Sequence, residues 1–350
     1  MLELWDAQDA FARVEDYLRE SEFFGGDQVA DVFLGYGLSQ VLRRDATPPL
    51  PDEPCRLPLA TCRIRPASER TDRKNNFRVG AWRRSWTDAG YAAAIENVQD
   101  AIARGDVYQV NLVQHLFAPF AGDPSGLAAR LAPLAPLHGE PFLGGGWAIV
   151  SASPELFLAR RGRRLWTKPI KGTRPLGSTD ELAGSEKDTA EHVMIVDLER
   201  NDLSRVCEPG SIRWPELLEE HRLAGVSHLV STVEGRLREG VGLAEILAAT
   251  FPGGSITGAP KIAAVDQIAR LEPVGRGASM GAIGRIYPNG DFDLALTIRT
   301  FAVAEGRIHL WVGGGIVWDS EPEAEIEESW VKARPLLAAI GAPLPEPALV

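Results

Sequence analysis

Residues 281–301, GAIGRIYPNGDFDLALTIRTF, decide the fold class of this sequence. Two largely apolar runs flank Pro288-Asn289-Gly290, a turn of the kind that joins the strands of a β-hairpin. Residues 307–317, RIHLWVGGGIV, follow closely and predict a further strand. Adjacent hairpins imply antiparallel pairing, so this end of the chain predicts an antiparallel sheet.

Upstream of this hairpin, the sequence mixes helices and strands. A helix is expected to begin after an N-cap at Thr87 or Asp88 and to end at Gly105, because apolar residues between them recur on one stripe. No GxGxxG segment opens a βαβ unit, so a dinucleotide-binding fold has no support. We therefore predict an α+β fold with large antiparallel sheets. The other expected elements are strands at 107–120, 147–151, 155–160 and 163–167, and a long helix at about 189–206.

The composition is that of an acidic globular protein. The 350 residues include 37 Lys and Arg against 48 Asp and Glu, which gives a formal net charge of −11. This balance argues against binding to a phosphate backbone, so we expect no nucleic-acid partner. We also expect no membrane association, because uncharged stretches are shorter than the ~20 apolar residues of a membrane span and the first residues do not resemble a signal peptide.

Cysteine usage indicates a reducing compartment. The sequence has three cysteines, Cys55, Cys62 and Cys207, which form neither a disulfide framework nor a paired zinc motif. We therefore expect buried or idle thiols and a cytoplasmic location. The proline-dense stretch 45–58, DATPPLPDEPCRLP, is typical of a surface connection within a small N-terminal portion, residues 1–85.

Two pairs of acidic residues lie near expected helix starts. Asp188 and Glu191 are three residues apart, as are Glu325 and Glu328, and this spacing places each pair on one helical face. The first pair is also typical of helix capping, and the second could be solvated beyond a cap at Ser320. Alternatively, the two pairs together supply the hard oxygen ligands that Mg²⁺ prefers.

Cationic and glycine-rich segments point to an acidic substrate. Residues 253–261, GGSITGAPK, form a glycine-rich loop that leads into a helix, where free amides, the helix dipole and Lys261 favour an anion. The loop is not a Walker A motif. Lys332 lies one helical turn after Glu328. Arg299 ends an expected strand, and an arginine alone is more often a surface residue. A metal beside Arg299 and Lys332 would suit a substrate with more than one carboxylate.

Lys171 and Glu155 are the candidates for covalent and acid chemistry. Residues 167–177, TKPIKGTRPLG, place other cations around Lys171, and a lysine near cations or desolvated by burial loses its proton more readily. The alternative is a basic loop in solvent. Glu155 lies among apolar neighbours, the setting that keeps a carboxyl protonated for general-acid work. The alternative is an ordinary polar residue at a strand edge.

Taken together, these segments resemble the chorismate-utilising enzymes, and most closely their aminodeoxychorismate synthase (para-aminobenzoate synthase) component I branch. The resemblance extends from about residue 86 to residue 333. It implies an α+β fold in which two large antiparallel β-sheets pack face to face with helices outside. It also implies that residues 1–85 contribute to this sandwich and that residues 86–345 form the chorismate-binding catalytic domain. The matching blocks are SPELF (153–157), PIKGTRPLG (169–177), EHVMIVDLERNDLSRVCEPGSI (191–212), HLVSTVEGRL (228–237), PGGSITGAPKIAAV (252–265), GAIGRIYPNGDFDLALTIRTF (281–301) and GGGIVWDSEPEAEIEESWVKA (313–333).

The resemblance also assigns roles to individual residues. Mg²⁺ would be the cofactor, held by Glu191 and Glu328 with Asp188 and Glu325 as supporting acids. His228 matches a histidine near the leaving hydroxyl, although a lone histidine is usually structural. The implied catalytic residues are Glu155, Lys171 and His228. The implied substrate-binding residues are Gly172, Thr173, Thr257, Gly258, Arg299, Gly313, Gly314, Gly315 and Lys332.

Two positions select the reaction within this family. Relatives that add water to chorismate carry a lysine base where this chain has Gln109, and anthranilate synthases read PIAGT where this chain reads PIKGT. The resemblance thus implies that Lys171 adds at C2 of chorismate while Glu155 protonates the departing C4 hydroxyl. Ammonia then gives 4-amino-4-deoxychorismate, a precursor of p-aminobenzoate and folate. Anthranilate synthase component I is the nearest alternative.

The expected partners are chorismate and a separate glutamine amidotransferase subunit that supplies ammonia. The sequence shows no G-x-C-x-G nucleophile segment and no spare length for a glutaminase domain. Two positions depart from the family pattern. Ser279 stands where an aromatic residue is common, which makes a catalytically silent chorismate-binding subunit a further alternative. Pro335 interrupts the last expected helix and predicts a kink near residues 331–334.

Overall fold

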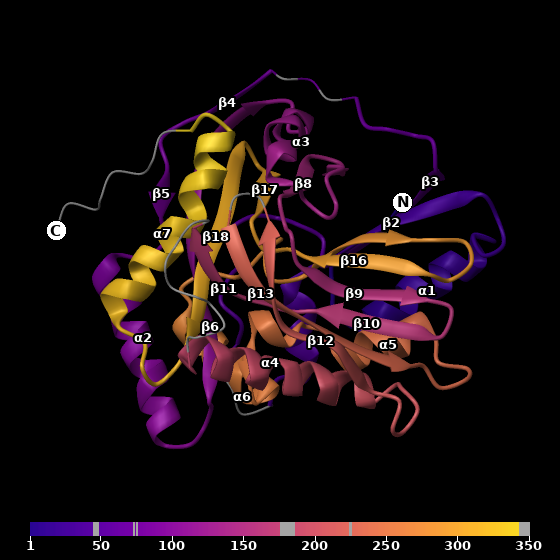
Figure 1. Ribbon diagram of the computed structural model, residues 1–350. Helices are drawn as coiled ribbons and strands as arrows, with labels where there is room; N and C mark the ends of the chain where they lie inside the picture. Colours follow the sequence, from indigo (N-terminus) through magenta and orange to yellow (C-terminus); the bar gives the residue numbers. More distant parts are fainter. Residues whose placement is uncertain (45–48, 73, 75, 176–185, 224–225, 343–350) are drawn as a thin grey trace.

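Two antiparallel sheets and the helices around them make up the fold (Figure 1). The computed structural model describes residues 1–44, 49–72, 74, 76–175, 186–223 and 226–342, and of residues 172–175, 186–188, 222–223 and 226–228 it describes the backbone only. Every strand pair within these ranges is antiparallel. The predicted α+β class is therefore confirmed.

The larger sheet is built around the hairpin that the sequence predicts at residues 288–290. Its strands β15 and β16 pair from Ala282 with Leu296 to Ile286 with Phe292. β15 also pairs with β2, so the N-terminal strands join the same sheet. The order is β1-β3-β2-β15-β16-β9-β10-β13-β11, with β12 added to β13. The strands are β1 (Leu2–Leu4), β2 (Gln28–Leu34), β3 (Ala60–Pro66), β9 (Leu156–Arg161), β10 (Arg164–Lys168), β11 (Ile170–Pro175), β12 (Arg213–Leu223), β13 (Val226–Arg236), β15 (Ala282–Ile286) and β16 (Phe292–Leu296).

The smaller sheet centres on the long strands β6 and β18, which pair along their length from Arg307 with Pro119 to Ile316 with Val110. Its order is β14-β6-β18-β17-β8-β7, and β4 and β5 add to β6. The predicted strands at 107–120, 147–151 and 307–317 are confirmed in this sheet. The strands are β4 (Phe77–Val79), β5 (Arg83–Arg84), β6 (Gln109–Gly122), β7 (Phe142–Leu143), β8 (Trp147–Ser151), β14 (Gly258–Ala259), β17 (Thr300–Ala304) and β18 (Arg307–Ile316).

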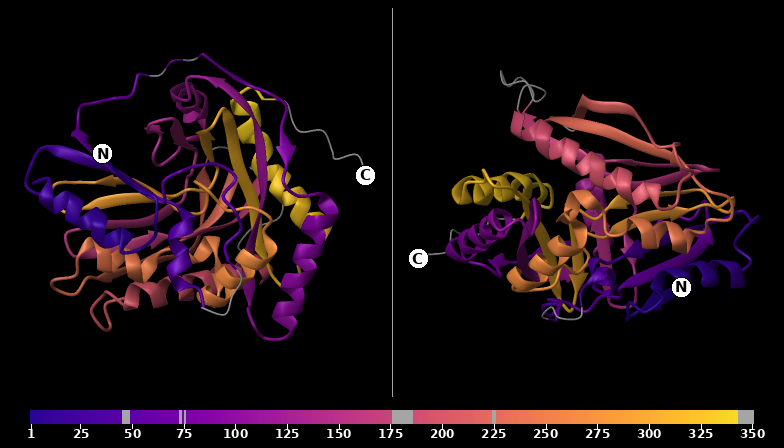
Figure 2. Two further views of the ribbon diagram at one scale, coloured as in Figure 1. Left: turned by 180° about the vertical axis from the view of Figure 1, so that it is seen from behind. Right: turned by 90° about the horizontal axis from the view of Figure 1, so that it is seen from below.

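Helices cover the sheets from outside, with α2 and α7 together on one flank and α4 and α5 on another (Figure 2). The predicted cap of α2 is confirmed, because Thr87 Oγ1 accepts a hydrogen bond of 3.0 Å from Gly90 N. α7 continues through Pro335 to Ala339, so the proline does not end this helix; a kink near residues 331–334 stays a prediction. The helices are α1 (Ala10–Glu20), α2 (Asp88–Ala103), α3 (Ser125–Leu131), α4 (Glu186–Ser204), α5 (Leu243–Thr250), α6 (Lys261–Leu271) and α7 (Pro322–Ala339), with 3₁₀ turns at η1 (Tyr36–Leu42), η2 (Ala132–Leu134) and η4 (Gly254–Ile256).

Two apolar cores hold these layers together. The larger core contains side chains from both sheets, such as Phe33 and Leu294 of one and Leu112 and Trp311 of the other. The second core fills the space between the smaller sheet and helices α3 and α7. The three cysteines are buried free thiols, as predicted. None of the described helices combines the length and apolar character needed to cross a membrane.

Candidate active site

Three of the predicted acidic ligands converge on the glycines of β18. A Cβ atom added to Gly314 would lie 3.2 Å from Glu325 Oε2 and 3.2 Å from Glu328 Oε1. One added to Gly315 would collide with the Gln109 amide and lie 2.8 Å from Glu191 Oε1. Glycine is required at position 315 because a side chain would take the place of the Gln109 amide, and at position 314 a side chain would crowd the two α7 carboxylates. Acids from α4 and α7 thus stand at neighbouring glycines of β18, near enough for Glu191 to influence Glu328 electrostatically.

Glu191 is the hub of the hydrogen bonds at this point. Its Oε1 accepts from Lys171 Nζ at 2.5 Å and from Gln109 Nε2 at 2.7 Å. Burial would raise the pKa of Glu191, but Lys171 and Gln109 outweigh it and hold this pKa below its ordinary value. Glu191 therefore remains a carboxylate despite its burial.

The sequence predicts cations around Lys171, but the structure places acids there. Burial lowers the pKa of Lys171, yet the nearby carboxylates of Glu191, Glu155 and Glu328 raise it by more, so the net shift is upward. Lys168, one of the cations expected beside it, instead binds Glu216 at 2.9 Å. Lys171 is consequently a charged group that acids surround, and its proton must be passed on before it can act as a nucleophile.

Lys332 supports the acidic cluster from the next turn of α7. Its Nζ lies 2.6 Å from Glu328 Oε1, as the spacing of four residues predicts, and it donates to Gly313 O at 2.7 Å. Lys332 is also the main reason that the pKa of Glu328 is lowered. Among the described strands, β17 pairs with residues 307–310 of β18 and stops short of Gly313. One edge of the glycine segment therefore has no strand beside it in the described structure.

Glu155 lies on the other side of Lys171 in a buried position before β9. Its Oε1 accepts from Ser255 Oγ at 2.8 Å and from Ile170 N at 3.5 Å. Burial raises the pKa of Glu155, and this effect exceeds the opposing influence of Ser255, Lys171 and the Ile170 amide. The expected protonated carboxyl therefore has its physical basis in this fold. Sequence reasoning missed Ser255, because its partner lies a hundred residues away in the chain.

Arg299 faces the same region. Its backbone has a left-handed φ of 50°, which is uncommon for a residue with a side chain and often marks a functional position. Burial lowers the pKa of Arg299, and Glu155 is the acid that opposes this shift. Within the described part of the chain, its guanidinium makes no ion pair. Arg299 is thus a cation available to an acidic ligand.

The glycine-rich loop before α6 differs from the predicted anion pocket. Lys261 Nζ forms an ion pair with Asp202 and donates to Thr250 O at 3.1 Å, so this cation is committed to the protein. Thr257 is buried and donates its hydroxyl to Gly253 O at 2.9 Å. Gly258 pairs with Val110 of β6 at a φ of 136°, where a side chain would collide with a backbone carbonyl. Substrate contact by Thr257 and Gly258 stays a prediction.

Some predicted site residues have side chains outside the described structure. Gly172 and Thr173 lie on β11, His228 lies on β13 opposite His221, and Asp188 lies in the first turns of α4. Their backbones are therefore placed, and their roles stay predictions.

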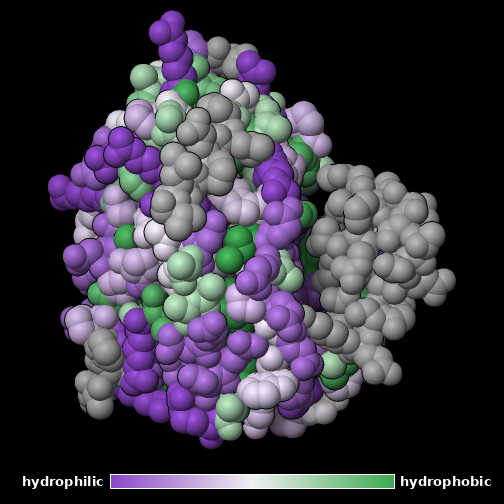
Figure 3. All heavy atoms as spheres, turned by 90° about the vertical axis from the view of Figure 1, so that its left-hand side faces the viewer, coloured by the Kyte–Doolittle hydropathy of each residue, from purple (hydrophilic) through white to green (hydrophobic). Residues whose placement is uncertain are grey.

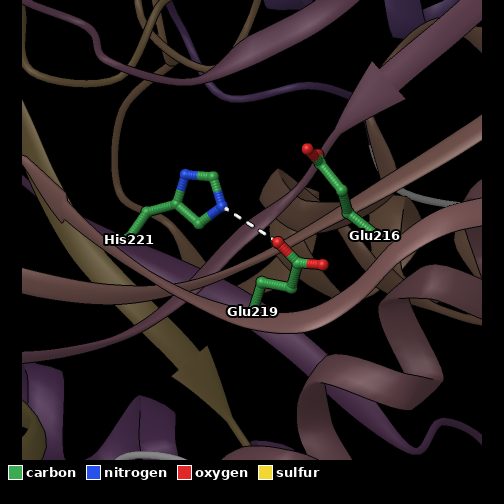
Figure 4. A group of neighbouring side chains, drawn as sticks. All are labelled: Glu216, Glu219 and His221. Carbon is green, nitrogen blue, oxygen red and sulfur yellow. Dashed lines mark ion pairs between the residues drawn. The ribbon is translucent and has the colours of Figure 1, made fainter.

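A second acidic group lies apart from this site, on the exposed strand β12 (Figure 4). Glu216, Glu219 and His221 bring one potential ligand atom each within 4.8 Å of one another. Glu216 Oε2, however, already accepts from Lys168 Nζ at 2.9 Å and from Thr232 Oγ1 at 2.5 Å. The figure shows His221 directed toward Glu219, at 3.7 Å. This is an ion-pair network on a sheet surface, with one of its acids already satisfied.

Comparison with known proteins identifies the family. Residues 39–338 match the family described as chorismate binding enzyme. The chain belongs to this family. The chain is 41% identical over 272 residues to anthranilate synthase component 1 of Streptomyces coelicolor, a match that covers 74% of this chain and 53% of that protein. It is 43% identical over 269 residues to aminodeoxychorismate synthase component 1 of Klebsiella aerogenes, covering 74% of this chain and 59% of that protein.

Two solved structures have a similar fold. The crystal structure of anthranilate synthase component I from Streptococcus pneumoniae superimposes with a TM-score of 0.79 at 27% identity, covering 92% of this chain and 84% of that one. A putative isochorismate synthase from Bacillus anthracis superimposes with a TM-score of 0.74 at 23% identity, which supports the fold alone. The chain spans little more than half the length of the sequence relatives named above.

Proposed function

We propose that the chain catalyses the Mg²⁺-dependent amination of chorismate at C4 with ammonia, which gives 4-amino-4-deoxychorismate. The observation that carries this proposal is Lys171, a largely buried amine that hydrogen-bonds to Glu191 and lies within the electrostatic influence of Glu155. A nucleophile, an acid that holds its proton and an ionised carboxylate are the groups that this reaction needs.

The acidic cluster fits Mg²⁺ by its donor chemistry. Glu325 and Glu328 bring carboxylate oxygens to Gly314, and Glu191 brings one to the neighbouring Gly315. The three carboxylates do not all lie within 4.8 Å of one another, so a shared ion would draw them closer. Oxygen donors of this kind, one or two of them carboxylates, are what Mg²⁺ prefers. Glu191 and Glu328 would hold the ion, with Glu325 and Asp188 as supporting acids. Bound there, Mg²⁺ would attract a substrate carboxylate and neutralise the charge of the cluster.

The cations of the site would hold the carboxylates of the substrate. Arg299 has no ion-pair partner among the described residues, and Lys332 stands at the β18 glycines. The backbone of Leu112 and the amide of Gln109 already fill the space beside Gly313 and Gly315, and the Glu325 and Glu328 carboxylates stand beside Gly314. Contact between the backbone of these glycines and a substrate carboxylate stays a prediction. Together the two cations would fix the ring of chorismate between Lys171 and Glu155.

The chemistry follows from the two sides of Lys171. Lys171 Nζ loses a proton, for which Glu191 Oε1 at 2.5 Å is the acceptor in place. The free amine forms a bond to C2 while the C4–O bond breaks, and the hydroxyl leaves as water with the proton of Glu155. Ammonia then forms the C4–N bond, the C2–N bond breaks, and Lys171 is released. His228 stays a candidate for the surroundings of the leaving hydroxyl.

Formation of anthranilate is the second candidate function. Relatives named anthranilate synthase component 1 are as similar to this chain as relatives named aminodeoxychorismate synthase component 1. The lysine in PIKGT at 169–173 supports C4 amination, because a covalent lysine route needs that amine. A silent chorismate-binding subunit is a weaker alternative that rests on Ser279.

A product assay separates these functions. The protein is incubated with chorismate, Mg²⁺ and an ammonium salt, and the products are followed by fluorescence and mass spectrometry before and after an aminodeoxychorismate lyase is added. We expect p-aminobenzoate to appear after the lyase is added. Fluorescent anthranilate formed without the lyase would reject C4 amination, and chorismate binding without turnover would favour the silent subunit.

We further propose that ammonia comes from a glutamine amidotransferase partner. The relatives named above are called component 1, which implies a second component for those proteins. Glutamine in place of the ammonium salt should support turnover only when such a partner is added. Turnover with glutamine by this chain alone would contradict the proposed partner.

A further inference from the structure

Two buried acids on α4 hold the loop that joins α5 to α6. Glu199 and Asp202 lie three residues apart on one helical face and are almost completely buried. Glu199 Oε1 accepts a hydrogen bond of 2.9 Å from Gly254 N, and Asp202 forms an ion pair with Lys261. The two acids thus hold the inner part of this loop and the first residue of α6 against α4.

The loop approaches α4 so closely that Gly254 is required. A side chain at this position would lie 2.7 Å from Leu198 Cδ2 and 3.1 Å from Glu199 Oε1. The next residue, Ser255, turns to the opposite side and donates its hydroxyl to Glu155 Oε1 at 2.8 Å. Adjacent residues of η4 therefore bind two buried carboxyls, one behind the loop and one in the candidate active site.

The charges around both carboxyls are few and come from several elements. Glu199 faces Asp202 on its own helix, Lys261 on α6 and Glu155 before β9. Burial, followed by the charge of Asp202, raises the pKa of Glu199 to about 8, while Lys261 and the Gly254 amide oppose this shift. Arg205 acts on Asp202, and Lys171 and Arg299 act on Glu155.

We propose that Glu199 is a positioning residue for Glu155. It fixes the Gly254 amide and thereby the Ser255 hydroxyl, and its negative charge, once formed, helps Glu155 to retain its proton. Its hydrogen bond goes to Gly254, so it acts on Glu155 through the loop and through the electric field. The inference rests on the proposed function for the role of Glu155 as the acid.

Two substitutions separate the hydrogen bond from the charge. Glu199→Gln keeps an oxygen that accepts from Gly254 N but cannot ionise. Glu199→Met fills similar space and leaves the amide without an acceptor. Asp197→Asn is the matched control, because Asp197 lies on the same helix with an exposed side chain and pairs with Arg200 at 2.8 Å.

The pH profile of chorismate turnover gives the first readout. We expect Glu199→Gln to match the unsubstituted protein below pH 7 and to lose activity at a lower pH on the basic side, by roughly 0.5–1 pH unit, because Glu155 loses the support of a nearby charge. Glu199→Met should lower kcat ~10- to 100-fold at every pH with KM little changed, since the Ser255 hydroxyl is misplaced. Asp197→Asn should leave the profile unchanged.

A titration without substrate keeps this test separate from the proposed function. Infrared difference spectra follow the protonated carboxyl signals with pH, and the Glu155 signal is assigned by its loss in Glu155→Gln. We expect the Glu155 carboxyl to ionise at a lower pH in Glu199→Gln. If no variant turns over chorismate, the proposed function fails while this titration still decides the coupling. An unshifted Glu155 signal in Glu199→Gln, or an equal shift in Asp197→Asn, would overturn the inference.

Discussion

The two sides of Lys171 place the same chemical group in opposite environments. Glu155 is buried beside one hydroxyl, and burial raises its pKa. Glu191 is partly buried, but a lysine and an amide bind it directly and lower its pKa. A direct ion pair, rather than depth alone, therefore decides whether the pKa of such a glutamate is raised or lowered. One side of the site can donate a proton, and the other can bind cations.

Removal of Lys171 should have the largest effect, because this residue is shared by both sides. Lys171→Ala removes the proposed nucleophile, so we expect C4 amination to fall below detection while Mg²⁺-dependent chorismate binding persists. Product formation is measured by mass spectrometry and binding by calorimetry. Lys168→Ala is the matched control, because Lys168 lies three residues earlier and binds Glu216 outside the site. Full activity in Lys171→Ala would contradict the covalent route.

Replacing the acid side should have the next largest effect. Glu155→Gln keeps the shape of the side chain but cannot supply a proton, so kcat should fall ~10²- to 10⁴-fold with chorismate affinity retained. Ser255→Ala sharpens the comparison. The Ser255 hydroxyl lowers the pKa of Glu155, so its loss should raise that pKa and move the basic limb of the pH profile upward. A basic limb that moves downward would show that the limb reports another group.

Replacing the cation-binding side should affect Mg²⁺ instead. Glu191→Gln and Glu328→Gln each remove a proposed ligand, and we expect Mg²⁺ affinity to fall by more than the ~10- to 100-fold that loss of an outer partner costs. The loss of Mg²⁺ affinity in Glu325→Gln should lie within that range, because Glu325 is proposed as a supporting acid. Calorimetry with Mg²⁺ measures these losses, and Glu216→Gln on β12 serves as the control. Unchanged Mg²⁺ binding in Glu191→Gln would remove Glu191 from the metal site.

The parts of this contrast that depend on local sequence could be predicted. The turn at 288–290 encodes its hairpin, and helical spacing correctly joins Glu328 to Lys332. The parts that depend on distant segments could not. Lys261 was expected to face a bound anionic ligand, but it pairs with the protein's own Asp202, which comes from another helix. Lys171 was expected among cations, whereas the fold surrounds it with acids.

Long-range strand pairing sets the same limit for the fold. Each of β2 and β15 is a typical apolar strand by its sequence, but the pairing of Leu34 with Ala282 depends on the whole sheet. The function of an exposed surface is even harder to predict from sequence. The side formed around α2 and α7 carries mostly hydrophilic residues with scattered apolar ones (Figure 3). Such a pattern places these helices on the surface and does not by itself say where a partner would bind.

A buried histidine pair tests whether burial also disfavours the charged form of a base. This prediction has the smallest expected effect. His115 Nε2 and His309 Nδ1 lie 3.0 Å apart on β6 and β18. Burial lowers the pKa of His115 to about 3 and that of His309 to about 4. The unfolded chain therefore takes up protons near pH 6.5 that the folded chain refuses. The contribution of the two histidines to the free energy of unfolding is complete above this pH and is lost as the pH falls toward 4.

Urea unfolding at pH 7.5 and pH 5.5 measures this effect. Each histidine should lower the free energy of unfolding by about 1.4 kcal/mol at pH 5.5, because each remains neutral only in the folded state. His309→Phe keeps an aromatic ring but removes one titration, so the difference between the two pH values should shrink by that amount even if the variant is less stable at both. An unchanged difference would mean that His309 is already protonated in the folded protein, and that burial does not govern bases here as it governs Glu155.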